Sequence, residues 1–185
     1  VESLDRLTRE HPALTAKLLN NIALHLAPHA SVRVGLFADL ARFEPAEGAP
    51  RIDGDFAVTA DLPVRGIATS GWRGRSFSLG IADSVTVLAR TAAMADAAAT
   101  IIANAVNVDD PRIARRPANR LKDDSDLGDI PVTVDVPLLD AAQVQAALQA
   151  GATRARALQR DGLIHSALLI CQHRALGVEA VAPAR

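Results

Sequence analysis

Cysteine and long apolar runs are scarce in this chain. The 185 residues hold one cysteine, Cys171, which excludes an internal disulfide and a cysteine-based zinc site. A lone cysteine in an apolar run fits a reducing compartment, so we expect a cytoplasmic protein. No stretch of about eighteen uncharged apolar residues is present, so we expect neither a membrane-spanning helix nor a membrane partner. The chain also opens without the basic and apolar segments of a signal peptide.

An excess of charge of either sign is also lacking. Lysine and arginine number 20 against 21 acidic residues, which gives a net charge of −1. Without a positive field we expect no nucleic-acid partner. Hydrophobic residues make up 49% of the chain, which excludes a disordered protein and suffices for a core. We therefore predict a single soluble domain over residues 1–185.

Common catalytic and metal motifs are missing as well. The five histidines show no HExxH spacing, and no serine lies in GxSxG. The aspartate-rich segment 122–129 is not followed by the twelfth-position glutamate, nor flanked by the helices, that an EF-hand calcium loop requires. We expect a solvated turn there, entering a strand at Ile130. No catalytic residue can be assigned from these patterns.

Apolar periodicity in the first third of the chain predicts short elements. Leucine spacing over 2–19 indicates two helical pieces that Pro12 separates. Alternation over 21–40 around a turn at Pro28 predicts a half-buried β-hairpin. The Pro- and Gly-rich stretch 42–55 reads as an exposed connection.

Stronger signals follow in the rest of the chain. Helices are predicted at 91–107, where six of the ten residues of "TAAMADAAAT" are alanine, and at 140–162, between an Asp140 N-cap and Gly162. The segments that predict strands are 56–70, 85–88 (buried on both faces), 130–139 and a closing hairpin at 163–181. Between them, 106–129 reads as a long polar loop. The mixture predicts an α/β or α+β fold, a mixed or antiparallel sheet covered by helices.

The first helix carries one candidate metal site. Asp96 and Thr100 are four residues apart, so both project from one face and could share a hard cation or a magnesium ion bound to phosphate. The alternative is a solvated Asp96 and a Thr100 hydroxyl bonded to the carbonyl four residues earlier. Spacing alone leaves both open.

The stretch "ATSGWRGRS" carries one candidate anion site. It offers hydroxyls, glycines and arginines suited to anion binding: Thr69, Ser70, Gly71, Gly74, Arg73 and Arg75. Backbone N–H groups and a guanidinium there could bind an anion, or the segment could be a glycine turn with exposed arginines. Trp72, the only tryptophan, either stacks on a planar ligand or covers the edge of the core.

Three motifs, taken in order, resemble a known family. "GIATSG", "IADSVTVLA" and "ADAAATIIANAV" look like the C-terminal motif series of the ApbE-like superfamily, whose best-known members are FAD:protein FMN transferases. The tail from "RRPANRLKDDSDLGDIPVTVDVPLL" onward resembles the shorter, uncharacterised bacterial and archaeal branch. The resemblance covers residues 20–180 and implies an ApbE-like domain.

The resemblance implies a ligand and a metal. In the transferases, the aspartate and threonine of the A-D-A-x-A-T-type helix are magnesium ligands, and they match Asp96 and Thr100. The Thr-Ser-Gly loop, which lines the flavin nucleotide site, matches residues 69–71. The resemblance therefore implies FAD or FMN, magnesium, a small phosphate-bearing ligand and chemistry like FMN transfer. Magnesium with few protein ligands is completed by phosphates and water.

Two departures separate this chain from the transferases. They carry a His-Ile-x-Asp-Pro-x-Thr-Gly signature where this chain has "FSLGIADSVTV", and the nearest acidic residue, Asp83, is our remaining candidate cofactor-binding residue. Relatives also carry a Gly-Gly-Asp element just before the strand "IALHL", and several dozen residues separate that strand from a segment like "REHPALTAKLL". We interpret their absence as an internal segment missing near residues 19–22.

Two functions of other classes remain open. One is a non-catalytic cofactor-binding or accessory protein that retains the fold. The other is a homo-oligomeric scaffold in which the alanine-rich helix packs against a neighbour through its small side chains.

Overall fold

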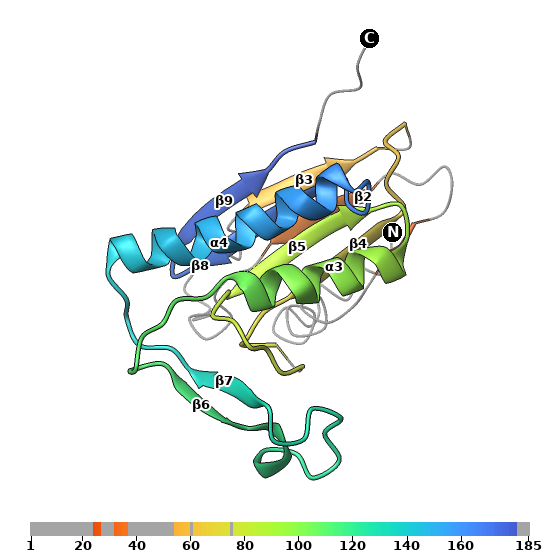
Figure 1. Ribbon diagram of the computed structural model, residues 1–185. Helices are drawn as coiled ribbons and strands as arrows, with labels where there is room; N and C mark the ends of the chain where they lie inside the picture. Colours follow the sequence, from red (N-terminus) through yellow and green to blue (C-terminus); the bar gives the residue numbers. More distant parts are fainter. Residues whose placement is uncertain (1–23, 27–31, 37–53, 60, 75, 181–185) are drawn as a thin grey trace, which may run out of the picture.

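The computed structural model describes residues 24–26, 32–36, 54–59, 61–74 and 76–180 (Figure 1). The helical pieces expected at 2–19, the proposed gap near 19–22 and Arg75 lie outside these residues, as does nearly all of the connection expected at 42–55. The described part holds two α-helices and antiparallel sheets, an α+β fold as predicted. Neither of these helices is long and apolar enough to cross a membrane.

A five-stranded sheet forms the centre of the molecule. Its strands, in spatial order, are β1 (Leu24–His25), β4 (Gly66–Ser70), β5 (Ser84–Ala89), β8 (Ser166–Cys171) and β9 (Arg174–Val178). Every neighbouring pair is antiparallel. Val85 and Val87 on one face of β5 are buried, and so is Thr86 on the other, which confirms a central strand covered on both sides.

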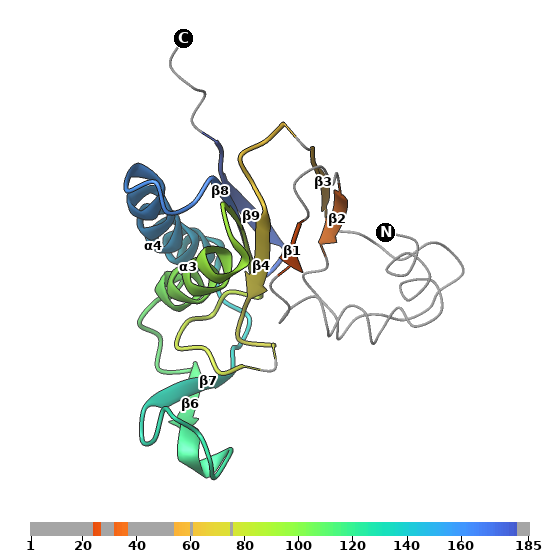
Figure 2. The ribbon, with the colours of Figure 1, turned by 90° about the vertical axis from the view of Figure 1, so that its right-hand side faces the viewer.

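Two helices cover one face of this sheet (Figure 2). The helix α3 (Ala92–Ala105) begins at Thr91, whose hydroxyl accepts the backbone N–H of Met94. The helix α4 (Ala141–Arg160) begins with a capping box between Asp140 and Gln143. Gly162 follows its end with φ +70°, a conformation that favours glycine. Both helices thus begin and end close to the predicted positions.

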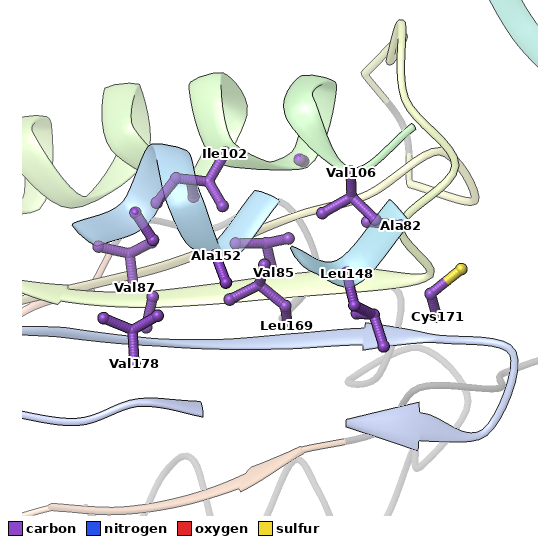
Figure 3. Packing of buried hydrophobic residues seen from close by; sticks show 14 of the residues in the cluster. Ala82, Val85, Val87, Ile102, Val106, Leu148, Ala152, Leu169, Cys171 and Val178 are labelled. Atoms are coloured by element: carbon purple, nitrogen blue, oxygen red, sulfur yellow. The ribbon is translucent and has the colours of Figure 1, made fainter. Parts of the chain in front are cut away.

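Small side chains let these layers approach closely. The buried face of α3 is formed by Ala95, Ala98, Ala99, Ile102 and Ala103. On α4, Gly151 faces Val106 and Leu169, and a β-carbon at this position would lie 2.3 Å from Val106 Cγ2. Figure 3 shows the resulting core between the helices and the strands. The alanine-rich composition therefore serves close packing between helix and sheet.

Two smaller sheets correct the sequence-based assignments. The strands β2 (Val32–Leu36) and β3 (Gly54–Val58) pair with each other, while β1 pairs with β4. The hairpin predicted over 21–40 is therefore wrong, because its two strands belong to different sheets and find partners distant in sequence.

The second correction concerns residues 106–129, which are not one long loop. They contain β6 (Ala114–Pro117) and the 3₁₀ helix η2 (Ala118–Arg120), and β6 pairs with β7 (Pro131–Asp135). We call residues 109–138 the arm, and Figure 1 shows it projecting from one end of the central sheet. The predicted strand at 130–139 is real but belongs to the arm.

Candidate functional site

The loop between β4 and β5 extends the sheet beyond its strands. The N–H of Trp72 donates to the carbonyl of Ala82 at 3.0 Å, and the N–H of Asp83 donates to that of Ile170 at 2.9 Å. Gly71 is buried against the same segment, where a β-carbon would lie 2.2 Å from the carbonyl oxygen of Asp83. Any side chain at this position would collide with the backbone, so Gly71 permits the close approach of the two ends of the loop.

Asp83 is a buried carboxylate at the start of β5. Its side chain joins two segments, because Oδ1 accepts the Nε–H of Arg73 at 3.1 Å and Oδ2 accepts the backbone N–H of Gln172 at 2.6 Å. Burial raises the pKa of Asp83, while the hydrogen bond from Gln172 and the charge of Arg73 oppose the rise. The loop and the β8–β9 turn are thus connected through one carboxylate.

Arg73 and Trp72 form the outer part of this site. The guanidinium carbon of Arg73 lies 4.7 Å from the centroid of the Trp72 ring, a cation–π contact. The Arg73 side chain is 36% exposed. The indole nitrogen of Trp72 is buried without a hydrogen-bond partner among the described residues, although it lies near enough to Asp83 to help lower that pKa. Trp72 therefore stacks on its own neighbour in this structure.

Gln172 is the functional position that sequence reasoning missed. It occupies the two-residue turn between β8 and β9 with φ 43°, and His173 follows with φ 65°. Its side chain donates to the carbonyl of Pro137 at 2.6 Å and accepts the N–H of Leu139 at 3.0 Å. The available signal was a two-residue hairpin turn, "QH", that contains neither glycine nor asparagine.

Cys171 lies beside this cluster and has an unreactive thiol. Its thiol is buried and contacts the carbonyl of Ile81 at 3.5 Å. Burial raises the pKa of Cys171 to about 12, and the nearby charge of Asp83 adds to the rise. A thiol with such a pKa is protonated at neutral pH and is a poor nucleophile.

Thr69 and Ser70 lie at the end of β4 on opposite faces of the sheet. The hydroxyls of Thr69 and Thr86 are hydrogen-bonded at 2.8 Å. Thr69 alternates with Ala68, which packs in the core beneath the helices, so Thr69 faces away from α3. Ser70 shares the helix-facing side by the same alternation and is half-buried.

Asp96 and Thr100 lie on the exposed side of α3. The Thr100 hydroxyl has no hydrogen bond to the carbonyl of Asp96 within the described residues, whereas Thr153 donates to the carbonyl of Gln149 at 2.8 Å. The backbone-bonded alternative expected from the sequence is therefore not what the structure shows for Thr100. Its hydroxyl remains available to a ligand.

The loop contacts the C-terminal end of α3, where the N–H of Leu79 donates to Asn104 Oδ1 at 2.9 Å. Thr100 lies one helical turn before Asn104 and Asp96 about two turns before it, which corresponds to about 6 Å and about 12 Å along the axis. The structure thus brings Gly71, Arg73 and Asp83 together in the loop and places Asp96 and Thr100 on the exposed side of the helix that the loop contacts. In the part that the structure describes, no three acidic, histidine or cysteine residues form a metal cluster.

The fold and the site define an α+β protein with a polar cluster at the end of its central antiparallel sheet. Over residues 2–180 the chain matches a family described as "AbpE bacteria", and it belongs to this family. It is also 48% identical over 62 residues to UPF0280 protein MK0206 of Methanopyrus kandleri. That match covers 33% of this chain and 26% of the relative, well under two thirds of the relative's length. No solved structure matches the chain.

Proposed function

We propose that the protein binds a flavin nucleotide or another phosphate-bearing cofactor together with magnesium, and that it has FMN-transferase-like activity. The observation that carries the proposal is the pair on α3, where an exposed carboxylate and an exposed hydroxyl without a backbone partner lie one turn apart. Asp96 and Thr100 are also the residues that match the magnesium ligands of the ApbE-like transferases. Membership of the family supports this reading.

The donor set of α3 fits magnesium in part. A carboxylate and a hydroxyl are hard oxygen ligands, and two of them leave most of an octahedral shell to phosphate oxygens and water. Bound magnesium would neutralise charge that develops on a phosphate. Asp96 and Thr100 would hold the ion, and Arg73 in the β4–β5 loop would contribute a positive charge to a ligand that reaches both.

An accessory protein without transferase chemistry is the second candidate, and Asp83 favours it. In place of the transferase signature this carboxylate is buried, and both of its oxygens accept hydrogen bonds from the protein. A carboxylate engaged in this way connects the loop to the β8–β9 turn, which suits a binding protein that lacks the transferase signature. An assay of FAD pyrophosphate cleavage distinguishes the two candidates, because an enzyme would cleave FAD and a binding protein would not.

The test is a calorimetric and fluorescence titration with FAD, FMN and ADP, with and without magnesium. We expect magnesium-dependent FAD binding that Asp96→Ala and Thr100→Val each weaken by about tenfold or more, as for the loss of one charged or ligating group. Asp123→Ala, an exposed carboxylate on the arm, is the matched control and should bind normally. If flavin affinity is the same with and without magnesium, and the same in Asp96→Ala as in the wild type, the result would favour the scaffold role for α3.

A further inference from the structure

The contact between Arg73 and Asp83 has the features of a pair that a ligand can separate. One hydrogen bond at 3.1 Å joins the two side chains. The pair formed by Asp110 and Arg112 has more contacts, because Arg112 binds both oxygens of Asp110 through Nε and Nη2. A single hydrogen bond from Asp83 to a guanidinium that is 36% exposed contributes little to stability, since solvent screens the charge of Arg73.

We propose that Asp83 is an internal counter-ion that competes with a phosphate-bearing ligand for Arg73, so that ligand binding at residues 71–74 releases Arg73 from Asp83. This inference rests on the proposed function, because it concerns the same ligand. Phosphate offers several oxygens in the geometry that a guanidinium binds best, whereas Asp83 offers one. Gly71 and Gly74 lie on either side of the Trp72–Arg73 pair.

Asp83 stays in place when Arg73 leaves. Its Oδ2 remains bonded to the N–H of Gln172, and that residue is fixed in turn by its bonds to Pro137 and Leu139. Among the described residues, the other groups that act on the carboxylate are the indole of Trp72 and the thiol of Cys171, and neither carries positive charge. A buried carboxylate that loses its cation binds a proton from solvent more readily.

Proton uptake therefore accompanies ligand binding. Burial already raises the pKa of Asp83 in the free protein, and removal of the Arg73 charge raises it further. Because the ligand-bound state holds more protons than the free state, affinity decreases as pH rises through this range. In this exchange Arg73 moves from the carboxylate to the phosphate, and Asp83 takes up a proton from the buffered solvent.

The fluorescence of Trp72 reports on this exchange. It is the only tryptophan and the chain has no tyrosine, so intrinsic fluorescence excited in the indole band reports on this residue. The Arg73 guanidinium lies over its ring at 4.7 Å, so departure of Arg73 changes the surroundings of the fluorophore. ADP is the suitable probe, because it carries phosphates without the absorbing flavin ring.

The experiment is an ADP titration of the full chain, followed by Trp72 emission and by calorimetry in buffers that differ in ionisation enthalpy. In the wild type we expect a change in emission, net proton uptake and an affinity that falls with pH. Asp83→Asn keeps an oxygen for Gln172 and removes the competitor, so it should bind ADP about two- to fivefold more tightly, with no proton uptake beyond that of ADP itself.

Arg73→Gln should lose most of the ADP affinity, while Arg120→Gln, an exposed arginine on η2, is the matched control and should bind normally. If wild type and Asp83→Asn bind ADP equally and take up the same number of protons, the inference is wrong and the proposed function stands. If the wild type binds neither ADP nor FAD, both the inference and the proposed function are wrong. If circular dichroism shows that Asp83→Asn does not fold, the Arg73→Gln variant decides the question. An ADP affinity of Arg73→Gln equal to that of the wild type would then overturn the inference.

Discussion

At the residue scale, the geometry of the site depends on a glutamine in a position that usually suits glycine or asparagine. Gln172 and His173 both have positive φ, which costs about 1–3 kcal/mol per residue for side chains of this kind. The turn persists because Gln172 makes three hydrogen bonds, one from its backbone to Asp83 and two from its side chain to the root of the arm. Strain in the turn is thus offset by the contacts that position Asp83.

Gln172→Ala should therefore destabilise the protein by about 1–3 kcal/mol, because it leaves the carbonyl of Pro137 and the N–H of Leu139 without their partners. Urea unfolding followed by circular dichroism measures the loss. The matched control is His173→Ala in the same turn, an exposed side chain whose removal should change the free energy of unfolding by at most about 0.5 kcal/mol. Equal losses in the two variants would show that the side-chain bonds of Gln172 do not stabilise the turn.

At the scale of elements, the packing of α4 against α3 and the sheet depends on a glycine inside a helix. Alanine at position 151 would favour the helix by about 1 kcal/mol on propensity alone. Its β-carbon, however, would lie 2.3 Å from Val106 Cγ2 and 2.7 Å from Leu169 Cδ2. The β-branched Val106 has little rotamer freedom with which to move away.

We predict that Gly151→Ala lowers the free energy of unfolding by about 1–2 kcal/mol, since overpacking outweighs the gain in propensity. Gly177→Ala is the control, because nothing lies within 4 Å of a β-carbon there and its φ is not positive. Thermal and urea unfolding compare the two. A stabilised Gly151→Ala would mean that α4 shifts at little cost and that the close approach is not a requirement.

The two helices could be predicted well because their caps and their composition are encoded in the residues of the helix itself. Thr91, Asp140 and Gly162 mark the ends of α3 and α4, and alanine content and apolar spacing define their interiors. Strand pairing has no such local signal. Residues 32–36 find their partner at 54–58 and not in the strand just before them, which alternation within a single segment cannot reveal.

The candidate site was predicted in parts. Gly71, Arg73 and Asp83 were identified from the sequence, and the structure brings them together because the β4–β5 loop returns to the sheet within thirteen residues. The role of Gln172 was not predicted, since it acts through a contact between segments 89 residues apart. The spacing of Asp96 and Thr100 placed them on one helix face, and the structure shows that this face is exposed.

At the scale of the whole molecule, two carboxylates act on stability with opposite dependence on pH. Asp110 at the root of the arm accepts hydrogen bonds from Arg112 and from Gln143 of α4. The side-chain bonds from Arg112, followed by its backbone N–H and Gln143, hold the pKa of Asp110 well below its usual range. For Asp83, burial raises the pKa above that range.

The signs follow from proton linkage. A carboxylate with a lowered pKa in the folded state stabilises the protein above its unfolded pKa, about 3.9, and this contribution is lost as pH falls toward the folded value. A carboxylate with a raised pKa has the opposite effect. Its ionisation costs nothing below about pH 4, and the cost grows as pH rises toward the folded pKa.

We therefore predict that Asp110→Asn and Asp83→Asn diverge from the wild type in different pH ranges. Urea unfolding from pH 3 to pH 8 should show the stability deficit of Asp110→Asn constant above about pH 5 and shrinking below about pH 4. Relative to the wild type, Asp83→Asn should gain stability as pH rises from about 4, and this gain should level off above the folded pKa of Asp83. Parallel pH profiles for Asp83→Asn and the wild type would mean that Arg73 and Gln172 fully compensate the burial of Asp83, and a carboxylate compensated in that way would not release Arg73 to a ligand.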